Sequence, residues 1–175
     1  MTEKQTSILK AALELFAQEG FKSTSTSKVA KRAGVSEGLI FRHFDNKDGL
    51  LQAIIQQGEE RARLLFADIV LETDPKEVVR KTLEMGKKTS MVKEEADFWK
   101  LQFKIKWELE QYGAYKMEPL LNALINAFIK LGYDEPELEA NFLTVFLDGL
   151  ATRFYLDKTF DMDAVLNFAK AKYGV

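Results

Sequence analysis

The chain has 175 residues, 46% of them hydrophobic and 30% charged, with a formal net charge of −2 at pH 7. This fits one or two globular units and excludes a membrane-spanning helix, because no apolar run reaches about eighteen residues. The N-terminus lacks the apolar core of a signal peptide, so we expect a cytoplasmic protein. The absence of cysteine excludes disulfides, thiolate metal sites and cysteine nucleophiles.

The first predicted helix covers residues 6–19. Its apolar side chains Ile8, Ala12, Leu15 and Phe16 fall on one helix face, and Gly20 follows as a stop signal.

A second short helix is predicted over residues 26–33 and ends at Gly34, which can adopt the left-handed conformation without strain. Ser36 is expected to cap the next helix with its hydroxyl, while Val35 and Ile40 form a hydrophobic staple around that cap. A helix that stops, turns within three residues and restarts under a cap is typical of a helix-turn-helix, whose second helix can enter the major groove of DNA.

Charge is concentrated in this segment. Between Lys22 and Lys47 there are six basic and two acidic residues, so the segment carries +4 and the rest of the chain −6. A basic patch on an acidic body is the electrostatic footprint of a nucleic-acid-binding surface. Charge alone would favour a solvated face, and the turn and its caps shift the interpretation to DNA binding.

Asn46 is the expected cap of a long helix over residues 47–71, which leaves the helix-turn-helix without a flexible linker. Asp74 and Pro75 open a further helix. The later predicted helices cover residues 75–91, 94–112, 119–131, 137–157 and 162–173. Strand alternation is absent, so we predict an all-α fold of about nine helices with domains at residues 1–46 and 47–175.

The helix at 137–157 is apolar on nearly every face, which indicates burial on all sides. A second copy of the chain could cover one stripe, or the helix could be the central core helix of a monomer; we favour a homodimer. The residues predicted at the dimer interface are Phe142, Val145, Phe146, Gly149 and Arg153.

The segments ILKAALELFAQEGF, VAKRAGVSEG and IFRHF follow one another in an order and spacing that resemble the TetR family of bacterial transcription regulators. The resemblance covers about residues 8–54. It implies an N-terminal three-helix DNA-binding domain with a helix-turn-helix and a C-terminal helical bundle for ligand binding and dimerisation. It also implies a homodimeric repressor that a small molecule releases from a near-palindromic operator in double-stranded DNA.

The predicted DNA-binding residues lie at the starts of the predicted helices at 26, 37 and 47 and along the second helix of the motif. They are Ser25, Thr26, Ser36, Glu37, Gly38, Phe41, Arg42, His43 and Lys47. Arg42 can read guanine bidentately or contact a phosphate, and Ser25 and Thr26 can cap the helix or also touch a phosphate. The resemblance implies a phosphate contact for His43. Lys47 combines its charge with free N–H groups at a helix start.

Two residues depart from the family's usual pattern. Glu37 stands where lysine is common and would repel phosphate unless it accepts from cytosine N4. Phe41 stands where tyrosine is common, so that packing on a thymine methyl group replaces a hydroxyl contact to phosphate. Both departures concern the operator sequence.

Aromatic side chains gather at Phe98, Trp99, Phe103 and Trp107, three of them on one helix face. They can be plain core, or they can line a pocket for an unknown, largely apolar ligand with Lys100, Gln102 and Lys104 as polar anchors. No cofactor is expected.

An all-α enzyme is the second class of function, although a single histidine and no cysteine leave it little catalytic chemistry. A third is a regulator that answers to a protein partner or binds DNA constitutively.

Overall fold

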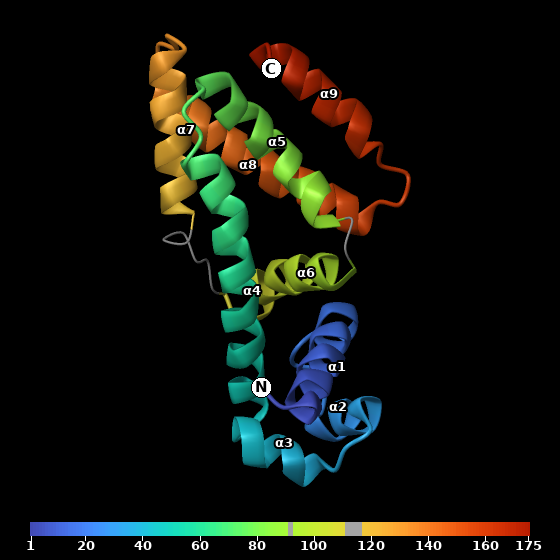
Figure 1. Cartoon of the computed structure of the whole chain (residues 1–175). Coiled ribbons are helices and arrows are strands. Elements are labelled where there is room, and N and C mark those ends of the chain that lie inside the picture. The colour runs from blue at the N-terminus through green and yellow to red at the C-terminus, as the bar shows by residue number, and fades with distance from the viewer. Residues whose placement is uncertain (91–92, 111–116) are drawn as a thin grey trace. The chain divides into compact units, whose positions relative to one another are not determined.

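The computed structural model describes residues 1–90, 93–110 and 117–175. These residues form α-helices joined by short connections, with no strand in the described ranges, which confirms the all-α prediction (Figure 1). No helix in the described part is long and apolar enough to cross a membrane. The chain divides into two compact units, one from residues 1–62 and 90–112 and the other from residues 63–89 and 113–175.

The helices lie close to their predicted positions. Their bounds are α1 Glu3–Glu19, α2 Thr26–Ala33, α3 Glu37–Phe44, α4 Lys47–Val70, α5 Pro75–Ser90, α6 Lys93–Glu108, α7 Glu118–Lys130, α8 Pro136–Leu156 and α9 Met162–Tyr173 (Figure 1). The predicted ends at Met91 and Tyr112, and the break at Gly113, lie outside the described residues.

The helix ends show which sequence signals act. Gly34 is left-handed at the end of α2, with φ 69° and ψ 35°, as predicted. The Asn46 side chain accepts a hydrogen bond from the Gly49 N–H at 2.8 Å and so caps α4. Asp74 caps α5 in the same way through the Lys76 N–H, at 2.9 Å.

One predicted helix start and one predicted side-chain cap were wrong. α1 begins at Glu3 rather than residue 6, because Thr2 and Gln5 form a capping box that adds one turn. Ser36 has the extended backbone of an N-cap, but its hydroxyl makes no capping hydrogen bond; the Leu39 N–H bonds to the Ser36 carbonyl instead.

The first unit is built on a core from α1 to α4 and α6. Ile8, Phe16, Ile40 and Leu50 are fully buried there, and burial of each such side chain contributes roughly 1.5–3 kcal/mol. α6 packs against α1 (Figure 1) and adds residues from its inner face to this core. The predicted boundary between residues 46 and 47 therefore differs from the division in the structure, which places α6 and the first part of α4 with α1–α3.

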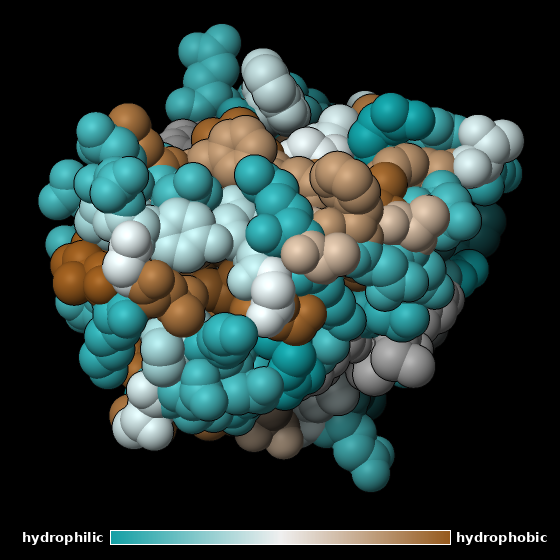
Figure 2. All heavy atoms as spheres, turned by 90° about the horizontal axis from the view of Figure 1, so that it is seen from above, coloured by the Kyte–Doolittle hydropathy of each residue, from teal (hydrophilic) through white to brown (hydrophobic). Residues whose placement is uncertain are grey.

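The second unit has its own core, in which α7 and α8 pack side by side (Figure 1). Ion pairs join its outer helices: Lys170 of α9 lies 2.7 Å from Glu84 of α5, and Glu84 also pairs with Arg80. The Lys170 ammonium holds the pKa of the Glu84 carboxyl below its usual value. On the face that Figure 2 shows, hydrophobic side chains reach the surface between hydrophilic ones.

Candidate functional site

α3 is an amphipathic helix held against the first unit by one side. Ile40 is fully buried on its inner side, and Phe44 and Leu39 pack partly against the same core. Its other side is exposed and carries residues predicted from the sequence, among them Gly38, Phe41 and Arg42. Phe41 is 46% exposed. The structure thus presents these three residues together on one exposed helix face.

A side-chain hydrogen bond joins the starts of α2 and α3. The Thr26 hydroxyl donates to Glu37 Oε1 at 2.6 Å. Because a hydroxyl has a single proton, Thr26 cannot donate to a second group in this arrangement. Ser25 differs: its oxygen accepts from the Lys28 N–H at 3.2 Å, which leaves the hydroxyl proton for another acceptor. Sequence reasoning found both residues and missed the Thr26–Glu37 bond, since spacing does not show which side chains meet across a turn.

Lys47 has a structural task that the sequence did not reveal. Its ammonium donates to the carbonyl oxygens of Phe21, Thr24 and Lys22, at 3.0, 3.2 and 3.4 Å, and lies 4.5 Å from the centre of the Phe21 ring. It therefore ties the start of α4 to the turn between α1 and α2.

The same turn is held from α6. Glu108 accepts from the backbone N–H groups of Phe21 at 2.9 Å and Lys22 at 3.4 Å, while Lys104 donates to the Gln18 carbonyl at 2.8 Å. Burial lowers the pKa of Lys104, and the neighbouring Lys100 charge adds to the shift. Lys104 is thus engaged with α1 rather than facing an open cavity.

The basic patch carries less unpaired charge than its composition suggests. Arg32 forms two hydrogen bonds to the Glu14 carboxylate, at 2.7 and 3.2 Å, and Lys28 lies 2.5 Å from Glu19. Both acids lie on α1, outside the segment counted in the sequence. Lys22, Lys31 and Arg42 are exposed and remain the basic side chains best placed for an anionic partner.

The aromatic cluster on α6 does not form one pocket. Phe98 is buried with Leu101 and Ile105, on the inner face of α6. Trp99 and Phe103 are half-buried, and Trp107 is 84% exposed. Of the four aromatic residues, Phe98 alone lines a described cavity, a space of about 130 Å³ beside Met1, Leu9 and Ile54.

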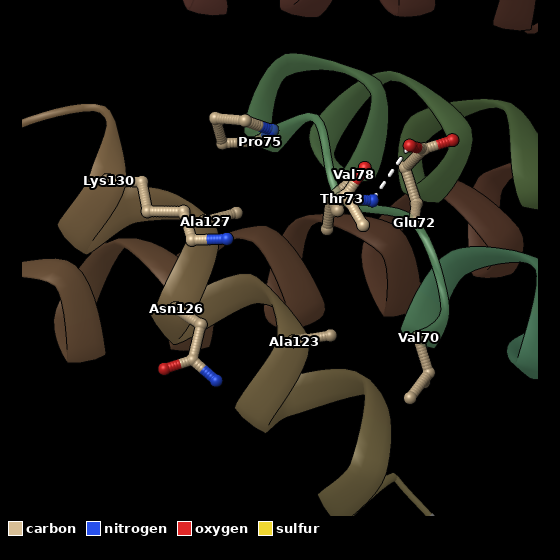
Figure 3. A pocket seen from close by; sticks show the side chains of 9 residues that line it. All are labelled: Val70, Glu72, Thr73, Pro75, Val78, Ala123, Asn126, Ala127 and Lys130. Atoms are coloured by element: carbon tan, nitrogen blue, oxygen red, sulfur yellow. Dashed lines mark hydrogen bonds between the residues drawn. The ribbon is translucent and has the colours of Figure 1, made fainter.

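A second cavity lies within the second unit, between the α4–α5 connection and α7 (Figure 3). Its volume is about 160 Å³, with an apolar wall from Val70, Val78, Ala123 and Ala127. Thr73, Asn126 and Lys130 add polar groups to its lining, and Glu72 lies at its edge, where it accepts from the Thr73 N–H (Figure 3).

One stripe of α8 faces solvent. Val145 is 69% and Phe142 55% exposed, Gly149 and Arg153 are exposed, and Phe146 is half-buried. The opposite stripe is buried through Leu143 and Leu150. The second unit covers one side of α8 only, so α8 is not a central core helix of the single chain; coverage of its exposed stripe by a second copy stays a prediction. Added atoms at Gly149 would meet nothing within 4 Å.

Comparison with known proteins matches the first unit to a family. The family model described as "Bacterial regulatory proteins, tetR family" matches residues 8–54. The HTH-type transcriptional regulator UidR of Escherichia coli K12 is 42% identical over 64 residues, which cover 37% of this chain and 33% of UidR. The HTH-type transcriptional repressor Rv3405c of Mycobacterium tuberculosis H37Rv is 36% identical over 83 residues, 47% of this chain and 42% of the repressor. The matches thus span about a third to two-fifths of these relatives.

Likeness of fold extends over the whole chain. A protein from Saccharomonospora viridis, solved in complex with choline, superposes with a TM-score of 0.79 at 18% identity and covers 96% of this chain and 94% of its own. At that identity the similarity concerns the fold alone.

Proposed function

We propose that this chain is a regulator of the TetR family, whose model matches residues 8–54, and that it acts as a homodimeric transcriptional repressor on a near-palindromic operator in the cytoplasm. The observation that carries this is the exposed face of α3, where Gly38, Phe41 and Arg42 stand on a helix whose other side is locked by Ile40. A rigid, exposed helix face with one cation and one aromatic ring is suited to reading base edges in a major groove.

Each exposed residue of the motif is assigned one contact with DNA. Arg42 reads guanine, and Phe41 packs on a thymine methyl group, while Gly38 lets the DNA approach the helix backbone. Ser25 and Ser36 donate their hydroxyl protons to phosphates.

The side chains that are already engaged have narrower roles. Glu37 keeps one carboxylate oxygen for cytosine N4 while the other holds Thr26, which contacts phosphate through its backbone N–H. Lys47 acts at the phosphate through the free N–H groups of the α4 start, because its ammonium is engaged with carbonyl groups.

The dimer forms through the exposed stripe of α8, which includes Phe142, Val145 and Phe146, with Gly149 allowing close approach and Arg153 at its end. Contiguous exposed apolar surface of this kind marks an interface. Two copies place one α3 helix on each of two half-sites. The centres of the half-sites are one DNA turn, roughly 34–36 Å, or a multiple of it apart.

A small, largely apolar molecule is the proposed signal, bound in the second unit. The cavity beside Val78 and Ala127 offers apolar walls with Asn126 and Lys130 as polar anchors. At about 160 Å³ it is smaller than typical ligand sites, so it admits a small molecule or the end of a longer one. The choline bound to the S. viridis protein shows that this fold can hold a small molecule.

Selection of bound sequences from a random DNA pool, at physiological salt, tests the proposal. The native protein should enrich a near-palindromic site, and a double variant Phe41→Ala, Arg42→Ala should enrich none, since both side chains are exposed and the variant keeps its fold. Absence of enrichment by the native dimer, with and without candidate ligands, would overturn the DNA-binding assignment.

A further inference from the structure

Thr2 and Gln5, at the start of α1, form a chain of hydrogen bonds with His43 on α3. The Thr2 N–H donates to Gln5 Oε1 at 2.8 Å, and Gln5 Nε2 lies 3.4 Å from Nδ1 of His43. Gln5 and His43 are 38 positions apart in sequence and both half-buried. Gln5 also precedes the stretch matched by the family model, so the resemblance assigns it no role.

The orientation of the Gln5 amide is decided by α1 itself. The capping box requires a hydrogen-bond acceptor opposite the Thr2 N–H, which the amide oxygen supplies. Turning the amide over would place its NH₂ group against the Thr2 N–H, two donors facing each other. The nitrogen of the amide is therefore the atom that faces His43.

An amide nitrogen can only donate, so His43 Nδ1 must be the acceptor. In a neutral imidazole one ring nitrogen accepts and the other carries the proton, which places the proton on Nε2. The second nitrogen of a histidine ring is commonly set in this way by the partner of the first. His43 thereby keeps a neutral N–H donor on the side of the ring away from Gln5.

We propose that Gln5 is a positioning residue that fixes His43 in the Nε2–H tautomer, so that this N–H donates to a phosphate of the bound DNA. The inference rests on the proposed function only for the identity of the acceptor. The tautomer itself is a property of the free protein. A hydrogen bond to a charged phosphate is worth about tenfold in affinity, the same for every DNA sequence, because phosphate carries no base information.

The substitution Gln5→Glu inverts the tautomer without removing the capping box. Glutamate at this position accepts from the Thr2 N–H as glutamine does, and its second carboxylate oxygen would face His43 Nδ1. Facing an acceptor, Nδ1 must carry the proton, and Nε2 loses its own. Lys4→Gln is the matched control, because it makes the same change of net charge at the adjacent exposed position and leaves Gln5 and His43 in place.

Two measurements test the tautomer of His43 and its phosphate contact separately. His43 is the only histidine, so two-bond ¹H–¹⁵N correlation spectra near pH 9, where an ordinary imidazole is neutral, report its tautomer unambiguously. The native protein and Lys4→Gln should show Nε2–H, and Gln5→Glu should show Nδ1–H. Binding to selected and to random duplex DNA at the same pH should fall about tenfold further in Gln5→Glu than in Lys4→Gln, equally for both sequences.

Each outcome has one meaning. An unchanged Nε2–H spectrum in Gln5→Glu would overturn the role of Gln5. An inverted tautomer with DNA affinity equal to that of Lys4→Gln would overturn the phosphate contact of His43 while leaving the tautomer assignment standing. Failure of the native protein to bind any DNA would refute the proposed function, which the spectra of the free protein do not depend on.

Discussion

At the scale of single residues, Lys47 shows how one side chain can take a role different from the one its position indicates. A lysine at a helix start in a basic segment suggests an anion site, yet its ammonium lies on three carbonyl oxygens of the α1–α2 turn. Carbonyl groups that lose a charged donor and stay half-buried cost about 1–3 kcal/mol.

We therefore expect Lys47→Met to lower the free energy of unfolding by about 1–3 kcal/mol in urea titrations. Lys31→Met, at an exposed position of α2, should change stability by less than about 0.5 kcal/mol. Equal stability of the two variants would show that the Lys47 ammonium is not needed by the turn and is free for phosphate.

Two glycines of the first unit differ in what surrounds them. A Cβ added at Gly49 would lie 2.0 Å from the Phe44 carbonyl oxygen, whereas a Cβ at Gly38 would meet nothing within 4 Å. The chain needs the close approach at Gly49 because Asp45, with φ 62° and ψ −49°, makes a tight γ-turn in which the Asn46 N–H bonds to the Phe44 carbonyl at 2.7 Å.

Gly49→Ala should accordingly destabilise the protein by about 2 kcal/mol or more, since backbone at a strained turn cannot yield cheaply. Gly38→Ala should stabilise it by about 1 kcal/mol through helix propensity while weakening operator binding, if DNA approaches the helix there. Thermal unfolding and operator titration measure both effects, and Gly86→Ala on α5, also with open space, is the control for propensity alone. Equal stability of the Gly49 and Gly38 variants would contradict the close contact.

At the scale of helices, the positions of most elements follow from the sequence because their end signals are local. Gly34, Asn46 and Asp74 act on groups within three or four residues, and each performs its predicted role. Partners across the fold were not predictable in this way. The placement of α6 against α1 depends on Lys104 and Glu108 meeting the end of α1 more than 80 positions earlier, a pairing that helical periodicity does not encode.

The same distinction applies to the candidate site. The exposed residues of α3 could be identified from the sequence, because the apolar residue Ile40 marks the buried face and the remaining face must then be exposed. The role of the aromatic residues of α6, as core or as pocket lining, could not be predicted. An aromatic stripe on a helix does not show which of its residues pack against another helix: Phe98 is buried while Trp107 is not. Gln5 was missed because a capping residue gives no sign of a second contact on α3.

The connection between α4 and α5 makes a pH-dependent contribution to the stability of the fold. Glu72 accepts from Lys81 and from the backbone N–H groups of Asp74 and Thr73, which lower its pKa from 4.5 to about 2. In the unfolded chain this carboxyl has its ordinary pKa, so below about pH 4.5 the unfolded state binds a proton that the folded state does not. The stabilisation is complete above that pH and is lost as the pH falls towards 2.

Glu72→Gln should remove this component. The stability difference between native protein and variant, measured by urea unfolding, should be largest near neutral pH and shrink between about pH 4.5 and pH 2. A difference independent of pH would mean that Glu72 acts through packing rather than through its charge.

At the scale of the whole molecule, the exposed stripe of α8 decides whether the protein can act on two half-sites. Large apolar side chains exposed by 55–69% at Phe142 and Val145 are costly on a monomer and are stabilised when a second copy removes them from water. Dimerisation would then supply the two-fold symmetry that a palindromic operator demands, and a single reading helix would hold too few contacts to bind tightly at physiological salt.

Val145→Glu should therefore convert the protein to a monomer in sedimentation-velocity experiments, because a dimer related by a two-fold axis would bury two unpaired carboxylates at once. Its affinity for a full operator should fall to that for an isolated half-site, with the fold retained in circular dichroism since the position is exposed. Ile129→Glu, which places the same charge on an exposed apolar position of α7, should leave both properties unchanged. If Val145→Glu stays dimeric and Ile129→Glu dissociates, the subunits meet through α7, and the spacing of the two α3 helices has to be derived from that interface instead.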